Sequence, residues 1–367
     1  MGSEMCIRDR YTTIEYSVRL VSTALTVEAG ISGFYVVITR SLAPIFFTVI
    51  GLPISEILKI NLVAYSIATL TSAALYRFKN FLISKIKLKL VVFHGLERVV
   101  WGLIPFAAAI SPTALYVVYA IAITLTVPTA ILMNNVLFGS LSEDEVRKLL
   151  SRRGVFGSLS SVLGQIVIVV TLALLAHGSK YLYLYLLAMC VGLISTMVLT
   201  LASIPSVINV KRLLSSVSSE EVMVKVTNVF LFLTLFLASS AVLGVIWVPY
   251  IMRYLRASDY LAASIGLVQT VTAIAASIFW ASRSYRTYRY AILSSSLIPI
   301  AITLTKVPEL HLIIAAVFSF TYTGANFLAS FIYAEAVKNI EVDRASVLLT
   351  SAGTLSQVLG LGLTYFI

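Results

Sequence analysis

Residues 157–164 are GSLSSVLG, and residues 353–360 are GTLSQVLG, a near-copy of the same eight letters. A second pair, LIPFAAAIS at 103–111 and LIPIAITLT at 297–305, recurs after almost the same interval. Pro44 and Pro249 form a weaker third pair. Because the matching segments are separated by nearly the same number of residues, they indicate an internal duplication, in which the second half of the chain repeats the first in the same order.

The motifs lie within long apolar stretches. Of the 367 residues, 59% are hydrophobic and only 12% are charged, whereas about a quarter of a soluble domain is charged. Eleven stretches are long enough to cross a bilayer as helices, near 20–50, 57–76, 90–110, 114–138, 155–176, 181–205, 227–252, 261–281, 290–305, 311–334 and 346–367. No sustained period-two alternation favours an outer-membrane barrel. The chain is therefore predicted to be an all-α polytopic membrane protein.

The duplication pairs the first stretch with the seventh, the third with the ninth and the fifth with the eleventh. Six stretches separate each pair, an even number, so both halves cross the membrane in the same direction. We expect two six-helix bundles related as parallel repeats, with the second bundle truncated before its sixth helix. The predicted domains are a non-native tail resembling a translated sequencing adapter, an N-terminal bundle, a cytoplasmic linker and a C-terminal bundle, at 1–10, 11–205, 206–226 and 227–367.

Lysine and arginine are distributed unevenly between the segments that join the stretches. With the N-terminus in the cytoplasm, the inner segments hold eighteen of them and the outer segments five. This bias predicts a multi-pass protein of the cytoplasmic membrane with a cytoplasmic N-terminus. The same bias accounts for the net charge of +11, because the basic inner segments face anionic lipid. No nucleic-acid partner is therefore expected.

These features together resemble the major facilitator superfamily of secondary transporters, in particular its prokaryotic members. The similarity rests on the parallel six-helix halves, on the charged linker, and on an inner loop between the fourth and fifth stretches, LSEDEVRKLLSRRGVFGSLSSVLG at 141–164, whose motif includes Arg153 and Gly154. The family's Gly-x-x-x-Asp-Arg-x-Gly-Arg signature is absent from YRFKNFLISKIKLKL at 76–90. The resemblance implies a monomer that moves a small solute by alternating access between two bundles, without a cofactor.

Charged side chains at membrane depth are costly and therefore need partners. Glu28 and Arg40 lie twelve residues apart on one helix, about 18 Å along its axis and about 120° around it, so they cannot pair with each other. Arg40 would suit an anionic group on the solute, and Glu28 could couple transport to protons or another ion. The alternatives are a structural ion pair within the N-terminal bundle, or Glu28 at the inner membrane interface.

A second charged group, His94, Glu97 and Arg98, lies in the third stretch. His94 and Arg98 share a helix face, whereas the adjacent Glu97 and Arg98 are not expected to face each other. We expect this group to form a structural or coupling ion pair. His177 and His311 are predicted in outer loops, exposed to solvent.

Three glutamines, Gln165, Gln269 and Gln357, fall near the middle of their stretches, and Asn326 joins them. Their amides cannot be satisfied by lipid. They are predicted to line the substrate pathway, with hydrogen bonding between helices as the alternative. The small-residue faces at Gly157–Gly164 and Gly353–Gly360 are expected to pack one bundle against the other.

Other functions find little support in the residues. A membrane-embedded transferase would hold metal-diphosphate through clustered aspartates, but Asp144, Asp259 and Asp343 are far apart. Two cysteines offer no thiolate metal site or disulfide framework. We therefore expect no metal and no enzyme activity. A flippase for lipid-linked oligosaccharides, which also has two six-helix halves, and a receptor or assembly subunit that transports nothing remain as alternatives.

Overall fold

The computed structural model describes residues 2–78, 81–82, 84–139, 143–175, 179–202, 204, 219–283, 285–337 and 340–366. His177 and most of the predicted linker lie outside this set. The predicted domain boundaries stay predictions.

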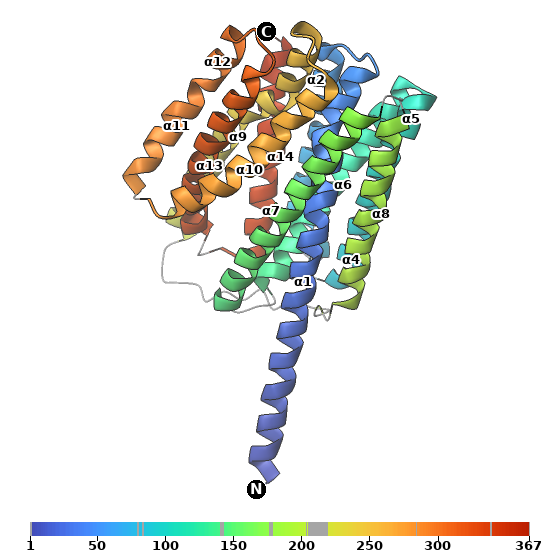
Figure 1. Ribbon diagram of the computed structural model, residues 1–367. Helices are drawn as coiled ribbons and strands as arrows, with labels where there is room; N and C mark the ends of the chain where they lie inside the picture. The colour runs from blue at the N-terminus through green and yellow to red at the C-terminus, as the bar shows by residue number, and fades with distance from the viewer. Residues whose placement is uncertain are drawn as a thin grey trace.

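The described chain is a bundle of long helices (Figure 1). The first half contains α1 (Gly2–Val49), α2 (Ile54–Arg77), α4 (Ile86–Gly102), α5 (Ile104–Ile110), α6 (Pro112–Gly139), α7 (Glu143–Leu174) and α8 (Ser179–Leu201). The second half contains α9 (Ser219–Tyr254), α10 (Asp259–Ala281), the 3₁₀ turn η1 (Tyr285–Thr287), α11 (Tyr288–Ser296), α12 (Ile298–Leu304), α13 (Leu310–Val337) and α14 (Val342–Phe366).

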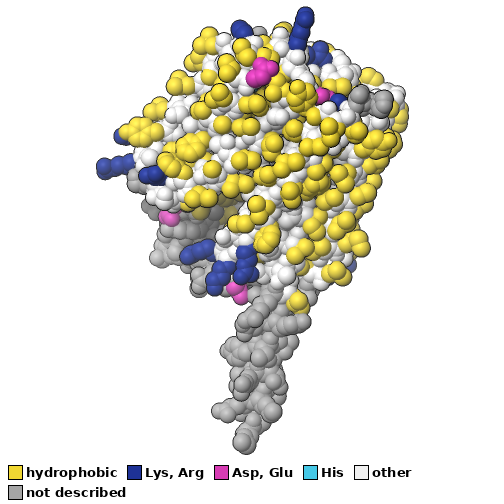
Figure 2. Space-filling model, in the orientation of Figure 1, with side chains coloured by type: hydrophobic (Ala, Val, Ile, Leu, Met, Phe, Trp, Pro, Cys, Tyr) yellow, Lys and Arg dark blue, Asp and Glu magenta, His cyan; other side chains and the backbone are white. Residues whose placement is uncertain are grey.

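The predicted membrane spans are all helical. Within the described residues, nine single helices are long and apolar enough to cross a bilayer, and the bent pair α4–α5 makes a tenth. The remaining predicted span is the shorter apolar segment Tyr288–Leu304, which contains α11 and α12. Large hydrophobic side chains such as Leu70, Ile278 and Ile313 are exposed on the bundle. Figure 2 shows such side chains over the face in view, with Lys and Arg concentrated near its ends. The protein is a multi-pass membrane protein.

Two helix breaks fall at equivalent positions in the repeat. Helix α4 ends before Leu103 and α11 ends before Leu297, and these residues have nearly the same backbone angles, φ −82° and ψ −9° against φ −83° and ψ −13°. Each is followed by Ile-Pro, and proline has no N–H to continue the helical hydrogen bonds. The chain bends by 46° at the first break. The repeated LIP motif therefore produces the same local structure twice.

Helix packing repeats as well. Helix α1 packs on α7, α2 on α6 and α4 on α6, while α9 packs on α14, α10 on α13 and α11 on α13. Figure 1 places α4 and α5 at one edge of the bundle and α11 and α12 at the other. The two halves contact each other through α7 with α10 and α2 with α14. This arrangement confirms the predicted parallel duplication.

The small-residue faces pack within each half and not between the halves, so that expectation was wrong. A methyl group on Gly33 of α1 would lie 2.4 Å from the carbonyl oxygen of Gly157 on α7, and one on Gly360 of α14 would lie 2.5 Å from that of Ala238 on α9. Helix α7 thus approaches α1, and α14 approaches α9, too closely for any side chain at Gly33 or Gly360.

Candidate functional site

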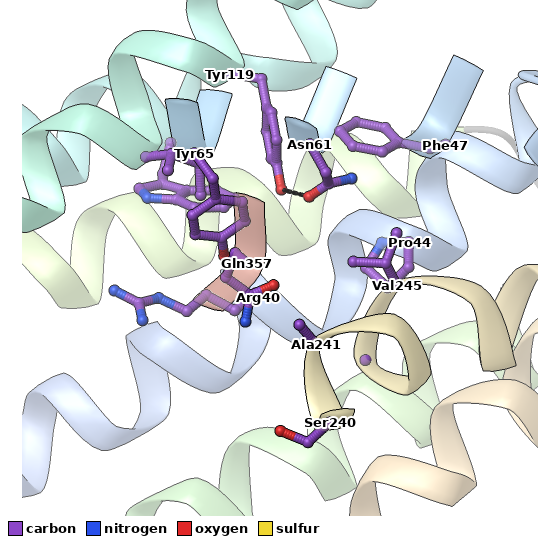
Figure 3. Close-up of a pocket in the computed structure, with 13 residues that line it drawn as sticks. Arg40, Pro44, Phe47, Asn61, Tyr65, Tyr119, Ser240, Ala241, Val245 and Gln357 are labelled. Carbon is purple, nitrogen blue, oxygen red and sulfur yellow. Dashed lines mark hydrogen bonds between the residues drawn. The ribbon is translucent and has the colours of Figure 1, made fainter. Parts of the chain in front are cut away.

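Two cavities lie between the halves, and we refer to them by size. The smaller cavity has a volume of about 160 Å³ and is shown in Figure 3. It is bordered by α1, α2, α4, α6, α9 and α14, through Arg40, Pro44, Phe47, Asn61, Tyr65, Trp101, Tyr119, Ile123, Ser240, Ala241, Gly244, Val245 and Gln357. Its walls therefore combine aromatic rings with one arginine and two amides.

The larger cavity has a volume of about 690 Å³ and is bordered by α1, α7, α10 and α13. Its lining is rich in hydroxyl groups. Among them, Thr270 and Ser277 donate to backbone carbonyl oxygens of their own helix at 2.8 and 2.7 Å, and Ser319 donates to the carbonyl of Gln269 at 2.6 Å. Because these hydroxyl protons are used, the oxygen atoms remain available mainly as hydrogen-bond acceptors.

The cavities lie at different depths in the bundle. Helix α1 contributes residues 29–37 to the larger cavity and residues 40–47 to the smaller one, so the smaller cavity is nearer the turn at Gly51. A hydrogen bond of 3.2 Å joins Ser240 Oγ, on the smaller cavity, to Tyr322 Oη, on the larger. The two spaces are therefore neighbours that share a polar contact between α9 and α13.

Glu28 is buried in the first half and has partners on three helices. Its Oε1 accepts from Ser32 Oγ at 2.6 Å and lies 3.2 Å from His94 Nε2, and its Oε2 lies 2.9 Å from Arg153 Nη1. With the proton on Nε2, a neutral His94 donates to Glu28 and accepts from Thr196 at 2.7 Å, a bond that competes with donation from the same hydroxyl to the Gly192 carbonyl at 3.2 Å. Arg153 also donates to the carbonyl of Leu25 and lines the larger cavity. Glu28 thus holds a cavity-lining arginine in place.

Glu97 joins the two other arginines. Arg98 Nη1 donates to Glu97 Oε2 at 2.9 Å, although neighbouring residues on a helix were not expected to face each other. The long guanidinium side chain folds back over the ring of Tyr35, 4.6 Å from its centroid, and so reaches the adjacent carboxylate. Arg40 Nη2 lies 3.8 Å from Glu97 Oε1. As the helical spacing requires, Glu28 and Arg40 take partners from other helices.

The four predicted amide positions differ in their surroundings. Gln357 lines the smaller cavity and Gln269 the larger one. Gln165 is buried, donates to Ser41 at 3.1 Å and packs against Gly266 of α10, so it lies at the contact between the halves. Asn326 is exposed on α13 and lines neither of the two cavities. Their roles in transport stay predictions.

Two expectations about loops were wrong. Arg153 and Gly154 do not lie in a loop, because α7 begins at Glu143 and continues through them. His311 is not solvated: it is buried in α13 and its Nδ1 accepts from Trp247 Nε1 at 3.0 Å. In both cases a charged or polar stretch suggested a loop, whereas packing against a neighbouring helix extends the helix through it.

Polar contacts join the halves at the end of the bundle that carries Gly51. Lys180 Nζ lies 2.6 Å from Asp259 Oδ2, and the Tyr181 hydroxyl donates to the same oxygen at 2.7 Å. These pairs connect α8 to the first residue of α10. Arg253 of α9 donates to the carbonyl of Leu52, in the turn between α1 and α2. The halves are therefore fastened together at this end.

Several lining residues were not singled out from the sequence. Asn61 donates to Ile57 at 2.7 Å and accepts from the Tyr119 hydroxyl at 2.7 Å (Figure 3). An amide within an apolar stretch is the signal that identified the glutamines, and it applied equally to Asn61. Tyr65 and Tyr119 could have been noticed because they lie inside their spans and not at the ends. Among the described residues, no group of three His, Cys, Asp or Glu side chains could hold a metal ion.

This architecture, with two parallel helix bundles around central cavities, is the fold of major facilitator superfamily transporters. The structure of the nucleoside transporter NupG matches with a TM-score of 0.68 at 13% sequence identity, over 94% of this chain and 90% of that one. A bacterial homologue of the human lysosomal transporter Spinster, inward-facing and unoccupied, matches with a TM-score of 0.62 at 13% identity, over 95% and 82%. No protein-family model and no curated protein matches the sequence.

Proposed function

We propose that the protein is a secondary transporter that moves a small solute across the cytoplasmic membrane by alternating access. The observation that carries this proposal is the pair of cavities at different depths between the two halves, which a buried ion pair joins at the end that carries Gly51, whereas toward the other end the hydroxyl groups of Ser72 and Ser351 meet at 2.6 Å. Solute sites in transporters of this architecture lie near the bilayer midplane between the repeats. With the predicted cytoplasmic N-terminus, the fastened end is the outer one and the state is inward-facing.

In this proposal the larger cavity is the inner vestibule and the smaller cavity holds the solute. Arg40 and Gln357 would contact the solute, and Gln269 would line its path. Glu28 would couple transport to protons or another ion, because its carboxylate connects His94 with Arg153, which lines the vestibule. Gln165 would act at the sliding contact between the halves. Asn326 lines neither cavity in this state and would contribute to the pathway in a different conformational state.

A flippase for lipid-linked oligosaccharides is the second candidate within the same fold. The size of the smaller cavity favours the small solute: about 160 Å³ is less than the 300–1,000 Å³ or so of a drug-sized ligand site. A lipid-linked sugar would have to use the larger cavity alone. The hydroxyl-rich lining there would bind sugar, but Arg40 would then have no ligand.

Thiol accessibility tests alternating access without knowledge of the solute. In a variant without cysteines, Gly244→Cys places a thiol on the smaller cavity, where an added Cβ meets nothing within 4 Å, and Ser277→Cys places one on the larger cavity. A membrane-impermeant maleimide should label Ser277→Cys from the inner side. It should label Gly244→Cys from the outer side only when the protein is outward-facing. Trapping the inward-facing state should therefore protect Gly244→Cys from outer label, and trapping the outward-facing state should protect Ser277→Cys from inner label.

The result that would overturn the proposal is simultaneous labelling of both positions from opposite sides in one trapped state, as an open pore would give. Unchanged labelling of both positions, whichever state is trapped, would also overturn it. The control is Gly353→Cys, which likewise has open space around its Cβ but lines neither cavity.

A further inference from the structure

Five charged side chains form one chain that connects the two cavities through the first half. From the larger cavity it runs from Arg153 to Glu28 at 2.9 Å, and from Glu28 to Ser32 at 2.6 Å. Ser32 Oγ then accepts from Arg98 Nη2 at 3.3 Å. The last links are the contacts of Glu97 described above, 2.9 Å to Arg98 and 3.8 Å to Arg40. The sequence of charges alternates from one cavity to the other.

The charges in this chain do not cancel. Three arginines face two glutamates, and His94 is satisfied in its neutral form. Arg153 and Arg98 each have a carboxylate oxygen at 2.9 Å, so the excess positive charge falls on Arg40. Its single carboxylate partner among the described residues, Glu97, is already bound to Arg98. Arg40 lines the smaller cavity with 51% of its side-chain surface exposed, so its charge is accessible to a ligand there, and one negative charge beside it would balance the chain.

The opposite wall of the smaller cavity is aromatic. The rings of Phe47 and Tyr119 meet edge to face at 5.1 Å, and those of Trp101 and Tyr119 at 5.8 Å. Asn61 donates one N–H to Ile57 and accepts from Tyr119, while the buried Nε1–H of Trp101 has no partner among the described residues and leaves a hydrogen-bond donor on this wall. In Figure 3, Arg40 and Gln357 lie on one side of the aromatic cluster. The cavity thus has one cationic end and one aromatic end.

The volume limits the size of the occupant. An engineered protein cavity of about 150 Å³ holds one benzene molecule, and the smaller cavity has about 160 Å³. We propose that its ligand is a small organic monoanion, with a carboxylate at Arg40 and an aromatic or compact apolar body of one ring against Tyr119 and Trp101. This inference rests on the proposed function, because it takes the smaller cavity as the solute site.

Binding of three matched probes tests the inference. Calorimetry on the purified protein in nanodiscs at pH 7 would compare benzoate, its uncharged analogue benzamide, and the dianion phthalate. We expect benzoate to bind at least ten-fold more tightly than benzamide, because only benzoate balances Arg40. Phthalate should bind more weakly than benzoate, since its second carboxylate would face the aromatic wall.

Variants of Arg40 and Glu97, the last two members of the chain of charges, test whether that chain causes the preference for benzoate. Arg40→Gln should remove the preference for benzoate over benzamide. Arg40→Lys should keep part of it, because the charge remains but the planar fork that fits a carboxylate is lost. Glu97→Gln leaves the chain with two excess positive charges and should improve phthalate binding relative to benzoate. Size-exclusion profiles identical to that of the unmodified protein would show that the variants are folded.

Three results would overturn the inference: benzamide binding as tightly as benzoate, no benzoate binding at millimolar concentration, or an Arg40→Gln variant that retains the preference. The thiol-accessibility experiment separates this failure from failure of the proposed function. Alternating accessibility without benzoate binding would overturn the ligand class alone. Benzoate binding that depends on Arg40, without alternating accessibility of the two thiols, would support the ligand site and overturn the proposed transport function.

Discussion

Glu28 accepts contacts from α1, α4 and α7 while almost completely buried, through Ser32, His94 and Arg153. Its carboxylate therefore does two things at once. It balances the charge of Arg153, and it fixes the positions of three helices of the first half relative to one another. A neutral side chain of the same shape would preserve the packing and remove only the charge.

We predict that Glu28→Gln lowers the free energy of unfolding by about 3 kcal/mol, the low end of the cost of breaking a buried ion pair, because Arg153 can turn into the larger cavity. The measurement is thermal unfolding in detergent. The control is Glu341→Gln, whose exposed pair with Arg344 at 3.4 Å should contribute about 1 kcal/mol or less. Equal effects of the two substitutions would contradict a structural role for Glu28.

The sequence identified Glu28, Arg40, His94, Glu97 and Arg98 because a charge within an apolar stretch is visible without any structure. It could not identify their partners. The link from Glu28 to Arg153 spans 125 residues, and its existence depends on the close approach of α1 and α7. The pairing of Glu97 with Arg98 depends on the side chain's conformation, which helical spacing alone does not determine.

At the scale of single helices, the repeated motifs act through close backbone contact. Gly360 has the carbonyl oxygen of Ala238 where its side chain would be, whereas Gly353, two turns earlier on the same face of α14, has open space. A methyl group at Gly360 must push α14 away from α9, whereas a methyl group at Gly353 has no neighbour within 4 Å.

Gly360→Ala is accordingly expected to destabilise the protein by about 1–3 kcal/mol, the usual cost of overpacking, and Gly353→Ala to be neutral or slightly stabilising. Melting temperatures of the two variants in the same detergent provide the comparison. If Gly353→Ala proves as harmful as Gly360→Ala, helix packing is not the reason for the glycines.

The position of these helices was predictable, and their packing partners were not. Hydrophobicity and the spacing of the matches predicted the helices and the duplication, including the paired LIP segments. Small residues on one face indicate a close approach, but nothing in the sequence states which helix approaches. The faces were therefore expected to join the two bundles, whereas they pack within each half. The break at Leu103 was also missed, since an apolar stretch has the same composition whether straight or bent.

At the scale of the whole molecule, Asp259 joins the halves through Lys180 and Tyr181 at the end that carries Gly51. Both side chains of the ion pair are mostly buried, with 12% and 15% of their side-chain surface exposed. Opening this end requires the two contacts with Asp259 to separate and to be hydrated.

We predict that Asp259→Asn shifts the population toward the state open at this end, because it replaces the ion pair with a neutral contact. Maleimide labelling of Gly244→Cys from the outer side should increase about ten-fold, which corresponds to about 1.4 kcal/mol. The charge-swapped double variant Lys180→Asp, Asp259→Lys should restore part of the original labelling. Unchanged labelling in Asp259→Asn would show that other contacts hold this end closed.

Substitutions in the cavity lining have different costs in the two halves. Every charged member of the chain from Arg153 to Arg40 comes from α1, α4 or α7, so a substitution there disturbs buried ion pairs and threatens folding. The second half contributes Ser240, Gly244, Val245, Gln269 and Gln357 to the cavities, none of which belongs to a buried ion pair among the described residues. Mutations in α9, α10 and α14 can reshape the lining at little cost in folding. Divergence after duplication would therefore give new substrates through the second copy while the first preserved the machinery.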